Sequence, residues 1–78
     1  MNKQTITLIN DYCDAILPGF SEENWIMATR ILRDLSPLID LEAYSALGDL
    51  MGEMYASPNT DTVVETRKMV INHLHEQG

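Results

Sequence analysis

Residues 40–57 carry apolar side chains at the spacing of one face of an α-helix. Steps of three, three, four, three and one separate Leu41, Tyr44, Leu47, Met51, Met54 and Tyr55. This spacing is typical of an amphipathic helix that buries one stripe, and Asp40 is placed to cap its first turn. Gly48 and Gly52 lie beside the stripe and leave room for a neighbouring helix to approach closely. The stretch therefore predicts a helix with a core-facing seam and a site of close helix contact.

Capping residues and prolines mark two helices before this one. The first is expected to begin at residue 5 or 6 and to end at Leu17, because Pro18-Gly19 cannot extend a helical hydrogen-bond ladder. The second can begin after Ser21, whose hydroxyl is a good N-cap. Phe20 before this cap and Trp25 in the first turns of the helix fit a hydrophobic staple. The sequence thus predicts two short helices joined by a tight turn.

A fourth helix is expected to begin between residues 60 and 62, after a polar connector. Thr62 and Glu65 fit the S/T-x-x-E capping box, and the end of the helix from His73 onward is expected to fray. No sustained period-two alternation and no Asn-Gly or Asp-Gly turn indicates a strand or a hairpin. The chain is therefore predicted to be a single all-α domain over residues 1–78, a small bundle of three to four helices.

The short chain favours association with a second copy. A chain of 78 residues buries only about 60–65% of the surface that its unfolded form exposes, and its one cysteine cannot form an internal disulfide. The second helix carries a wide apolar surface for its length, and Trp25, Ile26 and Met27 are interface candidates on it. We therefore expect a homodimer.

Charge limits the kinds of partner that the chain can bind. The formal net charge is −7, and seven acids but no base lie between Asp34 and Thr66. This balance disfavours nucleic acid and anionic membranes, which attract clustered Lys and Arg, and it favours a protein partner with a basic surface. The alternative is that the acids only keep the protein soluble. The polar first residues and the lack of a long apolar run predict a cytoplasmic protein without a membrane span.

Few residues could carry out a reaction. His73 and His75 are two residues apart and do not share a helix face, so we expect two solvated side chains and no metal site. Cys13 lies on an apolar stripe far along the chain from either histidine, and we expect a buried, inert thiol. Asp49 and Glu53 are carboxylates at i and i+4, but no pocket is predicted around them for acid–base catalysis. We therefore predict a protein that is not an enzyme, with no catalytic residue and no cofactor.

From Ile9 onward the chain contains Tyr12, the acidic pair Glu22-Glu23, apolar periodic helices through Leu50 and Met54, and the basic pair Arg67-Lys68 followed by apolar residues to Leu74. These features resemble the AriR/YmgB group of small bacterial regulators. This resemblance implies an all-α dimer without a catalytic motif. It also implies a regulator of biofilm formation and acid resistance that connects to a two-component phosphorelay. DNA binding has been suggested for that group, and the charge of this chain argues against it.

The leading hypothesis is a small acidic regulatory or adaptor protein that works by protein–protein contact. The predicted partner-binding residues are Trp25 and Met27, from the apolar surface of the second helix, and Asp49 and Glu53, from the acidic face of the third. The specific form that the resemblance implies is a connector to a two-component phosphorelay that controls biofilm formation or a stress response. The alternative is a phage- or plasmid-encoded inhibitor that mimics nucleic acid and blocks a basic site on a defence or regulatory protein.

Overall fold

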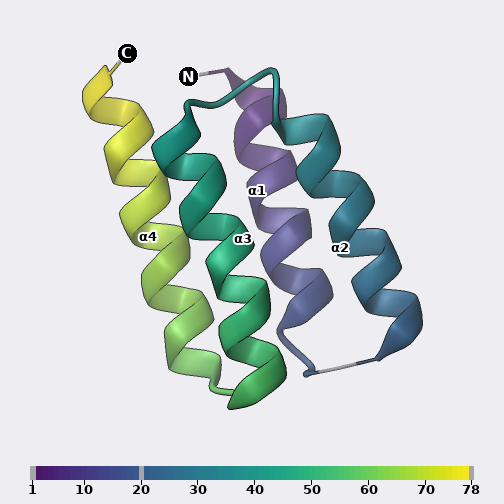
Figure 1. Cartoon of the computed structure of the whole chain (residues 1–78). Helices are drawn as coiled ribbons and strands as arrows, with labels where there is room; N and C mark the ends of the chain where they lie inside the picture. Colours follow the sequence, from purple (N-terminus) through teal and green to yellow (C-terminus); the bar gives the residue numbers. More distant parts are fainter. Residues whose placement is uncertain (1, 20, 78) are drawn as a thin grey trace.

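Four helices that alternate in direction form the described part of the chain, residues 2–19 and 21–77 of a computed structural model (Figure 1). They are α1 (Lys3–Ile16), α2 (Glu22–Leu35), α3 (Leu41–Ala56) and α4 (Thr60–Gln77). Each helix packs against the next one in the chain, and α4 also packs against α1, so the four close into an up-and-down bundle. This confirms the predicted small all-α bundle, with four helices in the described residues.

Side-chain caps set the starts of α2 and α3 as the sequence predicts. The Ser21 hydroxyl accepts a hydrogen bond from the backbone N–H of Asn24 at 3.3 Å. The Asp40 carboxylate accepts one from the N–H of Ala43 at 3.1 Å. Each cap satisfies an N–H group that has no partner inside its helix. Phe20 lies outside the described residues, so its staple contact stays a prediction.

Asparagine side chains cap the other two helices, at positions that the sequence patterns do not predict. The Asn2 side chain accepts a hydrogen bond from the N–H of Thr5 at 2.8 Å, so α1 begins earlier than expected. The Asn59 side chain accepts one from the N–H of Asp61 at 2.9 Å. The predicted capping box is wrong as a helix start, because Thr62 already lies inside α4.

The core runs along the centre of the bundle and takes side chains from all four helices. Its buried apolar residues are Ile9, Tyr12, Cys13, Ile16, Ala28, Leu32, Leu35, Ala43, Leu47, Leu50, Met54, Val63, Val70 and Leu74. Tyr12 donates a hydrogen bond from its hydroxyl to the carbonyl of Leu47, which links α1 to α3 inside the core. Burial raises the pKa of the Cys13 thiol to about 11. This confirms the predicted burial of the cysteine, and a thiol that keeps its proton is a poor nucleophile.

The buried face of α3 is rotated from the predicted stripe. Ala43 and Leu50 are buried, whereas Leu41 and Tyr55 are 78% and 64% exposed. The reason is that apolar side chains cover a wide arc of α3, and packing selects only part of that arc. Because α3 packs more extensively on α4 than on α2, the side of α3 that faces α2 is left partly in solvent.

The close helix contact predicted at Gly48 and Gly52 is not made by the helices described here. A Cβ atom at Gly48 would lie 4.0 Å from a methyl carbon of Leu32, which is an ordinary van der Waals contact. A Cβ atom at Gly52 would have no neighbour within 4 Å. Both positions of α3 therefore have room for a side chain. Because the two glycines lack one, the surface of α3 is recessed there and is not covered by another described helix.

Candidate functional site

Two adjacent large apolar side chains of α2 lie partly in solvent. Ile26 and Met27 are 48% and 50% exposed. Adjacent residues of a helix point about 100° apart, so these two side chains project toward different neighbours of α2. Ile26 lines a depression between α2 and α3, and Met27 lines one between α1 and α2. These two depressions, on different sides of α2, are the two candidate protein-binding sites.

The depression between α2 and α3, which we call the α2–α3 groove, contains apolar side chains with charged residues beside them. Its lining residues are Glu22, Trp25, Ile26, Thr29, Arg30 and Met51, and its volume is about 380 Å³. The Trp25 ring packs edge-on against the ring of Tyr55, with the two centroids 5.7 Å apart. The exposed Tyr55 ring thus extends the apolar surface of the groove toward the end of α3.

The depression between α1 and α2, which we call the α1–α2 depression, is more acidic. Its lining residues are Asp11, Asp14, Ala15, Pro18, Asn24, Met27 and Ile31, and its volume is about 440 Å³. Met27 and Ile31 lie four residues apart on one side of α2 and supply apolar surface. Asp11 and Asp14 bring two carboxylates from α1. Apolar surface beside carboxylates is suited to an amphipathic segment that carries basic residues.

The four predicted contact residues do not form one surface. Trp25 lies in the α2–α3 groove and Met27 in the α1–α2 depression, on different sides of α2. Asp49 and Glu53 are exposed on α3 and line neither depression. Within residues 2–19 and 21–77, no cationic side chain pairs with either carboxylate at 4.0 Å or less. The role of all four residues in binding stays a prediction.

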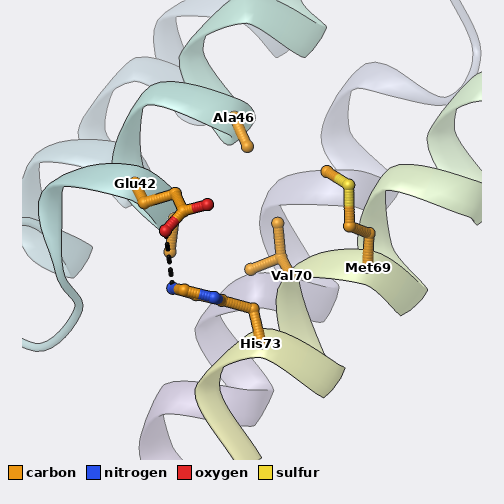
Figure 2. A pocket seen from close by; sticks show the side chains of 6 residues that line it. Glu42, Ala46, Met69, Val70 and His73 are labelled. Atoms are coloured by element: carbon orange, nitrogen blue, oxygen red, sulfur yellow. Dashed lines mark ion pairs between the residues drawn. The ribbon is translucent and has the colours of Figure 1, made fainter. Parts of the chain in front are cut away.

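A separate group of polar side chains joins the start of α3 to the end of α4. His73 Nε2 lies 2.8 Å from Asp40 Oδ2 and 3.6 Å from Glu42 Oε2, and Figure 2 shows His73 turned toward Glu42. Gln77 Nε2 donates a hydrogen bond to the same Asp40 oxygen at 2.8 Å. The prediction of a solvated side chain is wrong for His73, and α4 is helical to Gln77 where the sequence predicted fraying.

Hydrogen bonding sets the charge of this group. The hydrogen bonds from His73 and then from Gln77 lower the pKa of Asp40 to about 2. The same contact with the Asp40 carboxylate raises the pKa of His73 above its usual value. Both shifts favour an ion pair between the two side chains. His75 is exposed, as predicted, so only one of the two histidines belongs to the group.

The sequence contains one signal that could have identified this group. Asp40 and His73 are 33 positions apart, and no local motif connects them. In an up-and-down bundle, however, the start of α3 and the end of α4 lie at the same end of the molecule (Figure 1). The topology therefore brings the N-cap residue Asp40 next to His73 and Gln77, which lie four residues apart near the end of α4.

A small pocket adjoins the same group. Its volume is about 100 Å³, and Figure 2 shows it between α3 and α4. The lining residues are Glu42, Ala43, Ala46, Met69, Val70 and His73. This space can hold a few water molecules but not a large substrate. The ligand atoms of Asp40, Glu42 and His73 all lie within 4.8 Å of one another, and carboxylate and imidazole groups are common metal ligands.

Comparisons of the chain with protein-family models, with curated proteins and with solved structures find no match. None of them therefore tests the resemblance to the AriR/YmgB group, which stays a prediction. Among the four helices described, none is both long enough and apolar enough to cross a membrane. The surface features of the chain itself must therefore support any functional conclusion.

Proposed function

We propose that the protein is a small adaptor that binds an amphipathic helix of a partner protein in the α2–α3 groove. The observation that carries this proposal is that Ile26 stays half-exposed in the groove although the core already takes side chains from all four helices. Apolar surface that its own bundle leaves uncovered is typical of a binding site. A groove between two helices is a common acceptor for a third helix.

The recessed surface of α3 at its glycines also supports the α2–α3 groove as the binding site. An interior helical glycine costs about 1 kcal/mol relative to alanine, and no packing within the described chain requires Gly52. A helix that lies across α3 could approach its backbone closely at this position, because glycine has no side chain to hold it away. A partner helix would thus account for a residue that the isolated chain does not need.

The charge of the chain indicates what the partner helix carries. Glu22 lines the groove, and the net charge of the chain is −7. A partner with Lys or Arg beside its apolar stripe is therefore attracted and oriented by the field of the protein. Arg30 also lines the groove and can pair with one acid on the partner, which would fix the direction of the bound helix.

The regulatory role follows from the resemblance to the AriR/YmgB group and is a more specific form of this proposal. In that form the protein acts in the cytoplasm as a connector, and its partner is a component of a two-component phosphorelay that controls biofilm formation or a stress response. The homodimer expected from the sequence offers a different occupant: in that case a second copy of the chain, and not a partner helix, fills the groove.

A second candidate function rests on the acids of α3. Asp49 and Glu53 are exposed and have no cationic partner within the described residues. Exposed carboxylates could take the place of phosphates in the basic groove of a nucleic-acid-binding protein. An inhibitor of this kind, encoded by a phage or plasmid, would compete with DNA or RNA for its target, whereas a helix-binding adaptor would not.

The test begins with capture of the partner from nuclease-treated lysate by the tagged full-length chain, with identification by mass spectrometry. The affinity of the purified partner is then measured for Ile26→Asp and for Leu41→Asp, which changes an exposed leucine of α3 outside the groove. We expect Ile26→Asp to weaken binding at least about 10-fold, a typical loss for an interface anchor. Leu41→Asp should leave the affinity within about twofold.

Three outcomes separate the alternatives. Equal effects of Ile26→Asp and Leu41→Asp would exclude the groove as the binding site. Displacement of the partner by added DNA, together with loss of binding in Asp49→Lys and Glu53→Lys, would favour the inhibitor. Dimerisation of the purified chain in sedimentation equilibrium, abolished by Ile26→Asp, would identify a second copy as the occupant.

A further inference from the structure

We propose that Asp40, Glu42 and His73 form a binding site for a divalent transition-metal ion of the Zn²⁺ type, at the junction of α3 and α4. The site is independent of the proposed partner groove, which lies between α2 and α3. Its three ligand atoms come from the N-cap and first turn of α3 and from the C-terminal part of α4, and all lie within 4.8 Å of one another. One of them is an imidazole nitrogen, so the group is more than a cluster of surface acids.

The distances between these ligand atoms are close to those around a bound zinc ion. Zinc bonds of about 2.0–2.1 Å place neighbouring ligands of a tetrahedral site roughly 3.3–3.4 Å apart. His73 Nε2 lies 2.8 Å from Asp40 Oδ2 and 3.6 Å from Glu42 Oε2, on either side of that spacing. Binding therefore requires His73 and Asp40 to move apart by roughly half an ångström. Glu42 is largely exposed, so its side chain can move closer by a few tenths of an ångström.

The Asp40 carboxylate is held in place before any metal arrives. Its Oδ1 accepts the N–H of Ala43 at 3.1 Å as the cap of α3. Its Oδ2 accepts a hydrogen bond from Gln77 at 2.8 Å. Such supporting hydrogen bonds orient metal ligands and raise affinity in known metal sites. On binding, the ion replaces the proton that His73 shares with Asp40, and Gln77 keeps its contact with the carboxylate.

The donor set favours one class of ion. One imidazole nitrogen with two carboxylate oxygens suits Zn²⁺, Co²⁺ or Ni²⁺. Ca²⁺ and Mg²⁺ prefer sites made only of oxygen ligands. Three protein ligands leave a fourth position for water, and the pocket of about 100 Å³ beside Glu42 and His73 has room for it (Figure 2).

The net charge of the chain adds to the attraction of the site for a cation. His73 and Gln77 lie near the C-terminal end of α4, where the helix dipole is negative. Asp40 and Glu42, however, lie at the N-terminal end of α3, where the dipole is positive, so the two dipoles offset each other. The chain has a net charge of −7, which attracts cations to its surface. An ion bound there joins two helices, so it should stabilise the folded chain over the unfolded one.

The test is calorimetric titration of the full-length chain with ZnCl₂ at about pH 8, because protons compete with the metal for the imidazole. We expect one ion per chain, with a dissociation constant on the order of micromolar, and a rise in melting temperature that depends on zinc concentration. His73→Ala should weaken zinc binding at least about 10-fold. Glu42→Gln should weaken it to a similar degree, and it removes the ligand charge from a largely exposed side chain.

His75→Ala is the matched control, because it removes the exposed histidine two residues away. It should leave the zinc affinity and the stoichiometry unchanged. Co²⁺ gives an independent readout, since the visible absorption of a four-coordinate site should appear in the parent chain and in His75→Ala but not in His73→Ala. Equal losses in His73→Ala and His75→Ala, equal affinities for Zn²⁺ and Mg²⁺, or no zinc binding at millimolar concentration would each overturn the proposal.

Discussion

Tyr12 brings a hydroxyl into the centre of the core, where it donates a hydrogen bond to the carbonyl of Leu47. Burial raises the pKa of this phenol above its usual value, so the group stays a donor. We expect Tyr12→Phe to lower the free energy of unfolding by about 1 kcal/mol, the usual net value of one such bond. The ring that fills the core remains in this variant, so the loss should not approach that of a cavity.

Urea denaturation of the two proteins measures this difference. Tyr44→Phe is the control, because Tyr44 is only partly buried and water can reach its surroundings, and its effect should be clearly smaller. An unchanged midpoint in Tyr12→Phe would mean that the hydrogen bond across the core contributes nothing to stability. A loss above about 3 kcal/mol would mean that the core rearranges without it.

At the residue scale, the sequence predicted those features that depend on close neighbours. The caps Ser21 and Asp40 are of this kind, because each hydroxyl or carboxylate bonds an N–H three positions ahead. The partner of His73 could not be found in this way. It lies 33 positions away, and the contact exists only once α3 and α4 pack side by side.

At the scale of the helix, the glycines of α3 lead to a prediction about stability. We expect Gly52→Ala to raise the free energy of unfolding by about 1 kcal/mol, because alanine is the better helix former and its methyl group meets nothing. Thermal or urea unfolding checks this. Gly19→Ala is the contrasting variant, because Gly19 has a φ of +96° in the turn before α2. It should lower stability by about 1–2 kcal/mol.

The Gly52→Ala variant also bears on the function. If Gly52→Ala stabilises the isolated chain and also weakens partner binding, the glycine serves the interface and not the fold. Stabilisation with unchanged partner affinity would show that the partner helix does not approach α3 closely at Gly52. A loss of stability in Gly52→Ala would contradict the open space seen above this residue.

The order of helices was predictable, whereas the face that each one buries was only partly so. Prolines and caps divide the chain at places that the structure confirms to within a few residues, as with α3, which ends at Ala56. The stripe on α3 was misplaced because Leu41 and Tyr55 fit helical periodicity as well as Ala43 and Leu50 do. Only the packing of α3 against its neighbours decides between them, and periodicity does not contain that information.

At the scale of the whole molecule, the excess of acids should oppose folding. The molecule measures 33 × 22 × 18 Å and has a net charge of −7. At about 0.01 M salt the screening length is roughly 30 Å, so charges repel one another across almost the entire bundle. At about 0.5 M salt this length falls to about 4 Å, and only neighbouring charges still interact. Stability should therefore rise with salt.

We expect the free energy of unfolding, measured in urea, to increase by about 1 kcal/mol between 0.01 and 0.5 M NaCl. The double variant Asp49→Asn and Glu53→Gln should start from higher stability at low salt and gain less on addition of NaCl, because two unpaired charges are gone. Binding to a basic partner should respond in the opposite direction, since screening weakens attraction between the two proteins. A molecule that becomes more stable but binds less tightly as salt is added carries its charge for recognition, at the expense of its own folding. If instead neither the free energy of unfolding nor the affinity for the partner changes with salt concentration, the acids of α3 only keep the protein in solution.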